Sequence, residues 1–117
     1  MLVAPQRDFL HPVHFYVLAN QICKNANFEQ RQRFSNGSVF VQHFGASAAV
    51  CSDVWRYATL VPGTRPVHIL WALLFMKTYL TETILCSIVG VTVKTFRKWI
   101  WPVIRSIAAM ALYMVRG

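Results

Sequence analysis

The chain has 117 residues, and 56% of them are hydrophobic, including eight Phe, four Trp and four Tyr. This length suits one domain with a single core, and the large apolar share excludes an intrinsically disordered chain. Twelve Lys and Arg against four Asp and Glu give a net charge of +8, which favours polyanionic partners such as nucleic acid or an anionic membrane surface. Most of this excess lies in residues 65–117, which hold seven basic side chains and one acidic one.

The cysteines and the apolar stretches bear on where the protein resides. The three cysteines show no CxxC spacing, which predicts neither a disulfide framework nor a zinc ribbon and indicates reduced, intracellular thiols: Cys23, Cys51 and Cys86. Residues 1–6 lack the apolar core of a signal peptide. The apolar stretches 66–91 and 99–115 are interrupted by charged residues or proline, so we expect buried helices there and no membrane span.

The first 37 residues show no sustained hydrophobic period, because two prolines interrupt them and a polar run follows. We predict an irregular leader over residues 1–37, in which Val13 to Cys23 is the candidate for a short helix. The turn signal Ser35-Asn36-Gly37-Ser38 separates this leader from a domain of residues 38–117.

Residues 38–117 are expected to form an all-α, small helical bundle. A short helix from Ser38 places Phe40 and Phe44 inside and ends at Gly45, a residue suited to the left-handed C-cap position. Hydrophobic periodicity predicts four further helices, over residues 48–60, 66–79, 82–89 and 93–115. A capping hydroxyl or a proline stands at the start of each one: Ser47, Pro66, Thr81 and Thr92.

Two of these helices have special features. Helix 66–79 is apolar around most of its circumference, which predicts a position in the middle of the bundle. The last helix contains Pro102, which removes a backbone donor and clashes with the carbonyl of Lys98. We therefore expect a bend or a break at Pro102.

Residues 81–101 have the sequence pattern of a helix-turn-helix. A short helix is followed by a turn containing Gly90 and by a second helix whose first two turns are basic. Gly90 suits the turn because a left-handed residue costs least without a Cβ. One stripe of the last helix is apolar and predicted to be buried: Phe96, Trp99, Ile100, Val103 and Ile107. The opposite stripe holds cations and one more tryptophan: Lys94, Arg97, Lys98, Trp101 and Arg105.

This arrangement predicts double-stranded DNA as the partner. In a recognition helix, the N-terminal residues reach base edges and flanking cations hold phosphates. The predicted DNA contacts are Thr92, Val93, Lys94, Thr95, Arg97, Lys98 and Arg105. A solvated basic face without a ligand is the alternative interpretation of the same pattern.

Four segments between Phe40 and Ala109 form a further pattern: His43-Phe-Gly-Ala-Ser47 with Cys51 and Trp55, Pro66-Val-His-Ile-Leu-Trp-Ala-Leu-Leu-Phe-Met-Lys77, Thr81-Glu-Thr83, and Thr95-Phe-Arg-Lys-Trp-Ile-Trp101. This pattern resembles the N-terminal region of DDE-superfamily transposases of the Harbinger-like kind, and Phe-Arg-Lys-Trp is its most specific part. The resemblance implies a helix-turn-helix that docks on transposon DNA ahead of a catalytic domain.

The nuclease of that family needs three carboxylates in a separate ribonuclease-H-like domain, where they hold two metal ions. Here the acids are scattered, and none has a βαβ scaffold around it: Asp8, Glu29, Asp53 and Glu82. We therefore predict a truncated, transposase-like DNA-binding module that is no enzyme, uses no cofactor or metal, and is nuclear in a eukaryote. The apolar segment 103–115 is expected to pack against a missing catalytic domain or a partner protein.

Other interpretations stay open. The histidines are not spaced like zinc ligands and are expected at surface or capping positions: His11, His14, His43 and His68. A helical protein-interaction or membrane-surface module is the alternative function, with Trp101 inserted at an interface. Residues 44–55 also parallel residues 89–100, which fits either two similar helix-turn-helix units or chance similarity between two capped helices.

Overall fold

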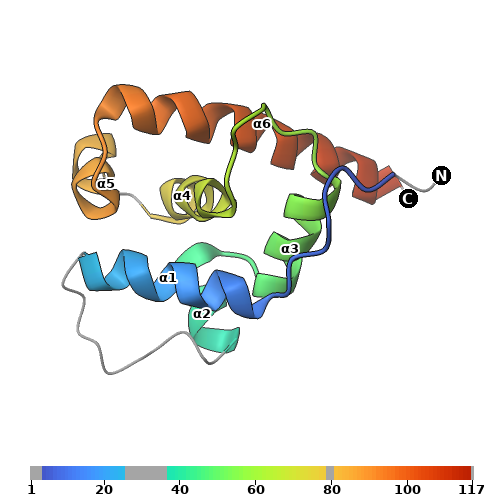
Figure 1. The fold of residues 1–117 in the computed structure, drawn as a ribbon, viewed down its shortest axis with the longest axis horizontal. Coiled ribbons are helices and arrows are strands. Elements are labelled where there is room, and N and C mark those ends of the chain that lie inside the picture. The colour runs from blue at the N-terminus through green and yellow to red at the C-terminus, as the bar shows by residue number, and fades with distance from the viewer. Residues whose placement is uncertain (1–3, 26–36, 79–80, 117) are drawn as a thin grey trace.

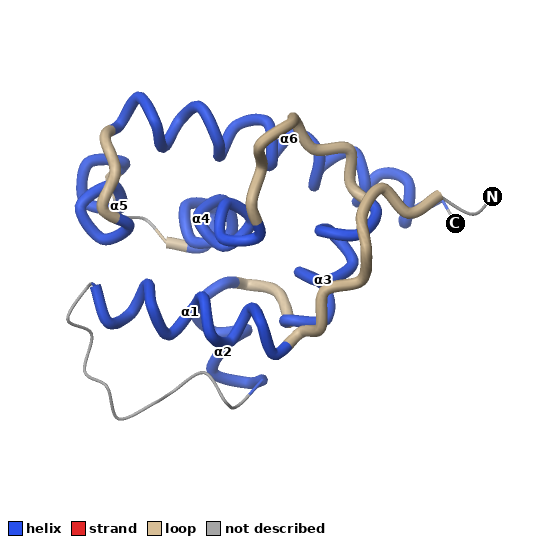
Figure 2. Tube along the Cα trace, viewed as in Figure 1, coloured by secondary structure: helices blue, strands red, loops and turns tan. Residues whose placement is uncertain are grey.

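A computed structural model describes residues 4–25, 37–78 and 81–116 of the chain. The described residues form six α-helices and no strand (Figure 2), so the predicted all-α class is confirmed. In Figure 1, α6 runs along one side of the molecule, α1 and α2 lie on the other side, and α4 lies between them. The helices are α1 (Val13–Asn25), α2 (Gly37–Phe44), α3 (Ala48–Tyr57), α4 (Pro66–Lys77), α5 (Glu82–Val89) and α6 (Val93–Arg116).

Local sequence signals set several of the helix ends. At the start of α3, the Ser47 hydroxyl accepts the Val50 N–H at 3.2 Å, and at the start of α5, the Thr81 hydroxyl accepts the Ile84 N–H at 3.3 Å. Gly45 follows α2 with φ of 76°, the left-handed conformation predicted for this C-cap. These predicted caps are confirmed, and each one satisfies a backbone group that the helix itself leaves unpaired.

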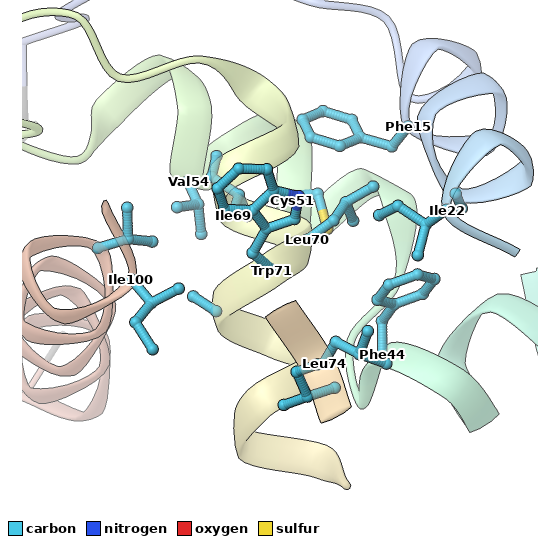
Figure 3. Packing of buried hydrophobic residues seen from close by; sticks show 14 of the residues in the cluster. Phe15, Ile22, Phe44, Cys51, Val54, Ile69, Leu70, Trp71, Leu74 and Ile100 are labelled. Carbon is cyan, nitrogen blue, oxygen red and sulfur yellow. The ribbon is translucent and has the colours of Figure 1, made fainter. Parts of the chain in front are cut away.

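Helix α4 is the centre of the core. Ile69, Leu70 and Ala72 are completely buried, which explains why this helix is apolar around its circumference. Figure 3 shows α4 surrounded by side chains from four other helices: Phe15 and Ile22 of α1, Phe44 of α2, Cys51 and Val54 of α3, and Ile100 of α6. The predicted place of this helix in the middle of the bundle is therefore confirmed.

Residues 1–37, predicted as an irregular leader, include helix α1. The short helix expected from Val13 is present and extends to Asn25, and it packs against α3, α4 and α5. Its Phe15, Ala19 and Ile22 are at most 4% exposed and recur at steps of four and three, so they share one face. Helix α1 therefore belongs to the same core as the domain that follows it. The turn signal expected at Ser35 and Asn36 lies outside the described residues.

Two helices end before the residue that the sequence pattern predicts. Helix α3 stops at Tyr57 and not at residue 60, because Ala58 adopts an extended conformation with ψ of 145°. Helix α4 stops at Lys77, where the Thr78 hydroxyl donates to the Leu74 carbonyl at 2.8 Å. The last residue predicted for this helix, residue 79, lies outside the described part of the chain.

Helix α6 continues through Pro102, so the expected break is not present, and the expected bend stays a prediction. Packing at this point offsets the cost of a proline inside a helix, which is about 3 kcal/mol. The next residue, Val103, is completely buried. The Ser106 hydroxyl lies 3.0 Å from the Pro102 carbonyl and 2.5 Å from the Thr59 carbonyl, so it ties α6 to the loop after α3.

Candidate nucleic-acid interface

Helices α5 and α6 are joined by the turn Gly90-Val91-Thr92. Gly90 is left-handed, with φ of 78° and ψ of 32°. The N–H groups of Gly90 and Val91 donate to the Cys86 carbonyl at 2.8 and 3.1 Å, so the turn satisfies the end of α5. The predicted order of short helix, glycine turn and second helix is confirmed, and Figure 1 shows the turn at one end of α6. The use of this unit to read DNA stays a prediction.

The start of α6 is fixed by two threonines. The Thr92 hydroxyl accepts the Thr95 N–H at 3.2 Å and donates to the Thr95 hydroxyl at 3.1 Å. Both hydroxyls, predicted as DNA contacts, are therefore engaged in capping, and the half-buried Val93 packs against the core. The first turn of a helix still presents backbone N–H groups and a positive dipole end, which favour an anion.

Helix α6 has two faces of opposite character. Phe96, Ile100 and Val103 are at most 1% exposed and belong to the core. Trp99 and Ile107, predicted on the same stripe, are only partly buried. The opposite side carries the exposed Trp101 and four exposed cations, and we call these cations the basic face: Lys94, Arg97, Lys98 and Arg105. The predicted assignment of the two faces is therefore confirmed in its main lines, and all four predicted cations lie on the exposed side.

Arg97 is paired with Glu82 of α5. The guanidinium Nε lies 2.5 Å from Glu82 Oε2, and Nη2 lies 3.5 Å from Oε1. This hydrogen bond raises the pKa of the Arg97 guanidinium above its usual value. The sequence indicated Glu82 only as an acid near the N-terminus of α5, because the pairing depends on how the turn at Gly90 directs the two helices. Lys94 and Lys98 pair with no carboxylate among the described residues.

Trp99 connects the basic face to the core through His68 of α4. The two rings stack with centroids 4.5 Å apart and planes 10° apart. The Lys98 ammonium also lies 4.9 Å from the centre of the Trp99 ring. Trp99 also fills the space beside Gly63, where an added Cβ would lie 3.1 Å from the indole. The aromatic ring thus fixes the rotation of α6 relative to α4 and the loop before it.

His68 caps the start of α4 from a buried position. Its Nδ1 accepts the Arg65 N–H at 3.0 Å, so the proton of the neutral ring lies on Nε2. Burial, with a smaller contribution from the Arg65 charge, lowers the pKa of His68 to about 4. His11 plays the corresponding part at α1, where its Nδ1 accepts the Val13 N–H at 3.1 Å. The capping role predicted for histidines is confirmed at these two positions, but the burial of His68 was not foreseen.

The predicted parallel between residues 44–55 and 89–100 extends to the turn geometry. Gly45 and Gly90 are left-handed, with φ of 76° and 78°, and each is followed two residues later by a capping hydroxyl. The helices after the two turns differ in charge. The exposed residues in the first two turns of α3 are Ala49, Val50 and Asp53, whereas α6 exposes three cations over the same length. The two segments therefore share the same type of turn, whereas only α6 of the two following helices carries a basic face.

Other chemistries find little support in the described residues. Cys51 and Cys86 are buried, and burial raises the pKa of the Cys51 thiol to about 12. No three His, Cys, Asp or Glu side chains come together there as metal ligands. Within the same described part, none of the helices is both long and apolar enough to cross a membrane.

Comparison of the chain with family models, curated protein sequences and solved structures gives no match. The resemblance to transposases therefore stays a prediction from the quoted sequence segments.

Proposed function

We propose that this protein binds duplex DNA through the basic face of α6. The observation that carries the proposal is the exposure of Lys94, Arg97 and Lys98 on the first two turns of a helix that follows a tight turn. The opposite side of that helix is fixed in the core by Phe96 and Ile100. A helix held in this way matches the dimensions of the major groove, which is about 12 Å wide.

The residues of the basic face have different parts in this proposal. Lys94 and Lys98 hold phosphates, since neither is paired with a carboxylate among the described residues. Arg97 is paired with Glu82 and keeps further N–H groups for a phosphate or a base edge. Arg105 lies about 16 Å along the helix axis from Lys94, so it would contact flanking backbone. The N–H groups at the start of α6 add donors for phosphate.

A transposase-derived origin and a nuclear location in a eukaryote belong to the same proposal, and the sequence resemblance is their support. The proposal includes no catalysis. The described acids Asp8, Asp53 and Glu82 lie on three separate segments, namely the stretch before α1, α3 and α5. Among the described residues, such a distribution offers no carboxylate cluster for the metal ions that phosphodiester cleavage by DDE transposases requires.

The proposal is tested by fluorescence anisotropy with a labelled duplex of random sequence over a series of salt concentrations. The triple variant Lys94→Ala, Arg97→Ala, Lys98→Ala should flatten the log-log salt slope by about 1.8 to 2.7 units, at about 0.9 per phosphate contact, because the Arg97 charge is partly neutralised by Glu82. Circular dichroism should show an unchanged helix content, because all three side chains are exposed.

The matched control is Lys77→Ala, which removes an exposed charge beside Gly45 at the end of α2. This variant should keep the salt slope of the wild type within the error of the measurement. A folded triple variant with the affinity and salt slope of the wild type would refute the proposal.

The second candidate is a membrane-surface or protein-interaction module, and the exposure of Trp101 favours it. Against a membrane, the apolar side of α6 from Phe96 to Val103 is already buried in the core, so this part of the helix would offer a bilayer little more than the Trp101 ring. Co-sedimentation with anionic liposomes distinguishes the two candidates. Binding to liposomes without salt-dependent binding to duplex DNA would favour the second one.

A further inference from the structure

Trp101 stands apart from the cations of the basic face because it is a large apolar side chain that is 41% exposed. Its ring contacts Phe75 of α4, with centroids 5.6 Å apart and planes 73° apart. Phe75 in turn contacts the buried Phe96, with centroids 6.3 Å apart. The indole is therefore supported from the core side by a series of rings, and its outer part remains open to a ligand.

Cations surround Trp101 on the same side of the helix. Arg97 and Lys98 precede it by four and three residues and Arg105 follows by four, so all three are its neighbours on the helix surface. An exposed aromatic ring among cations is the arrangement that binds single-stranded nucleic acid, in which bases stack on the ring and phosphates meet the charges. Within a duplex, the faces of the bases are covered by their neighbours, and the grooves offer only base edges.

We propose, building on the duplex binding proposed above, that Trp101 stacks on an unpaired base. The substrate class is then duplex DNA that carries a single-stranded extension, and not blunt duplex alone. Trp101 lies seven residues after Lys94, which is about 10 Å along the helix axis. This distance corresponds to about three steps of a DNA strand at 3.4 Å each. The stacked base therefore lies a few nucleotides from the phosphates held at the start of α6.

The test compares a blunt duplex with the same duplex carrying a short oligothymidine extension at its 3′ or its 5′ end. The wild type should bind one of the extended duplexes about tenfold more tightly, which corresponds to about 1.4 kcal/mol and to one stacked base. Trp101→Ala should bind blunt and extended duplexes equally and keep the salt slope of the wild type. Trp101→Phe, which retains a smaller ring, should keep part of the preference for the extended duplex. This variant provides the test if Trp101→Ala does not fold.

The matched control is Val50→Ala, which removes an exposed apolar side chain from α3 and should leave the preference intact. Equal binding of blunt and extended duplexes by the wild type would overturn this inference alone, because the duplex binding proposed above would still stand. A preference retained by a folded Trp101→Ala variant would also overturn it. Absence of salt-dependent binding to any duplex would instead refute the proposed function. Loss of binding to anionic vesicles in Trp101→Ala, with no effect on DNA, would assign the ring to a membrane.

Discussion

At the scale of single residues, His68 shows how a polar side chain is kept neutral in the core. The ring is 1% exposed, its Nδ1 is used by the Arg65 N–H, and one face is covered by Trp99. An imidazolium here would lose solvation and could not accept the Arg65 hydrogen bond. Burial, followed by the Arg65 charge, is therefore the cause that lowers the pKa of His68 to about 4.

This depressed pKa predicts a loss of stability in mild acid. The unfolded chain takes up a proton as the pH falls below about 6.5, whereas the folded chain does so only near pH 4, so protonation favours unfolding between those values. The free energy of unfolding should fall by about 2 kcal/mol between pH 7 and pH 5, measured by urea denaturation. In His68→Gln this fall should largely disappear. An identical pH dependence in the two proteins would show that His68 is not the responsible group.

Removal of the Glu82 carboxylate is expected to increase the affinity for DNA. It withdraws part of the Arg97 guanidinium from any ligand and adds a negative charge beside the basic face. Glu82→Gln should therefore tighten duplex binding at low salt and steepen the log-log salt slope by up to about 0.9, the value for one more phosphate contact. Glu82→Gln combined with Arg97→Ala serves as the control and should lose this gain. Weaker binding by a folded Glu82→Gln variant would mean that Arg97 needs Glu82 to be correctly oriented.

At the scale of elements, the sequence predicts helix ends better than it predicts contacts between helices. The caps at Ser47 and Thr81 and the left-handed Gly90 are local features, settled within a few residues of the chain. The pair of Glu82 and Arg97 is different, since fifteen residues separate them and the turn between their helices sets the distance. The two faces of α6 were predictable because hydrophobic spacing alone distinguishes them. The cation side of the candidate site could thus be predicted, whereas its internal ion pair could not.

Helix α6 offers a comparison of two tryptophans in one element. Trp99 stacks on His68 and packs beside Gly63, whereas Trp101 is 41% exposed and has Phe75 as its ring contact. Trp99→Ala should lower the free energy of unfolding by about 3 kcal/mol, the lower end for a truncated core aromatic. Trp101→Ala should cost at most about 1 kcal/mol. Thermal and urea denaturation of both variants measure the difference, and equal losses would show that the two faces of α6 are assigned incorrectly.

At the scale of the whole molecule, the all-α class and the central place of α4 follow from composition and from an apolar helix without a polar side. The packing of α1 into the core, in contrast, could not be predicted from the sequence. Its buried residues are interspersed with polar ones such as Asn20 and Gln21, so the apolar period is weak. Its packing partners, α3, α4 and α5, come much later in the chain, and single-sequence periodicity carries no information on such contacts.

The role of α1 leads to a prediction that separates a folded core element from a leader. Phe15 is completely buried, whereas Val17, two residues later on the same helix, is 55% exposed. If α1 is part of the cooperative unit, Phe15→Ala should lower the free energy of unfolding of the whole domain by about 3 to 5 kcal/mol. That is a large share of a typical stability of about 5 to 15 kcal/mol.

The matched control is Val17→Ala, which removes an apolar side chain from the exposed side of α1. This variant should change the free energy of unfolding by at most about 0.5 kcal/mol. Urea denaturation followed by circular dichroism and by tryptophan fluorescence measures both variants, and the two signals should change together because α1 itself contains no tryptophan. If Phe15→Ala leaves the fluorescence transition unchanged, α1 unfolds independently and the remaining helices form a core without it.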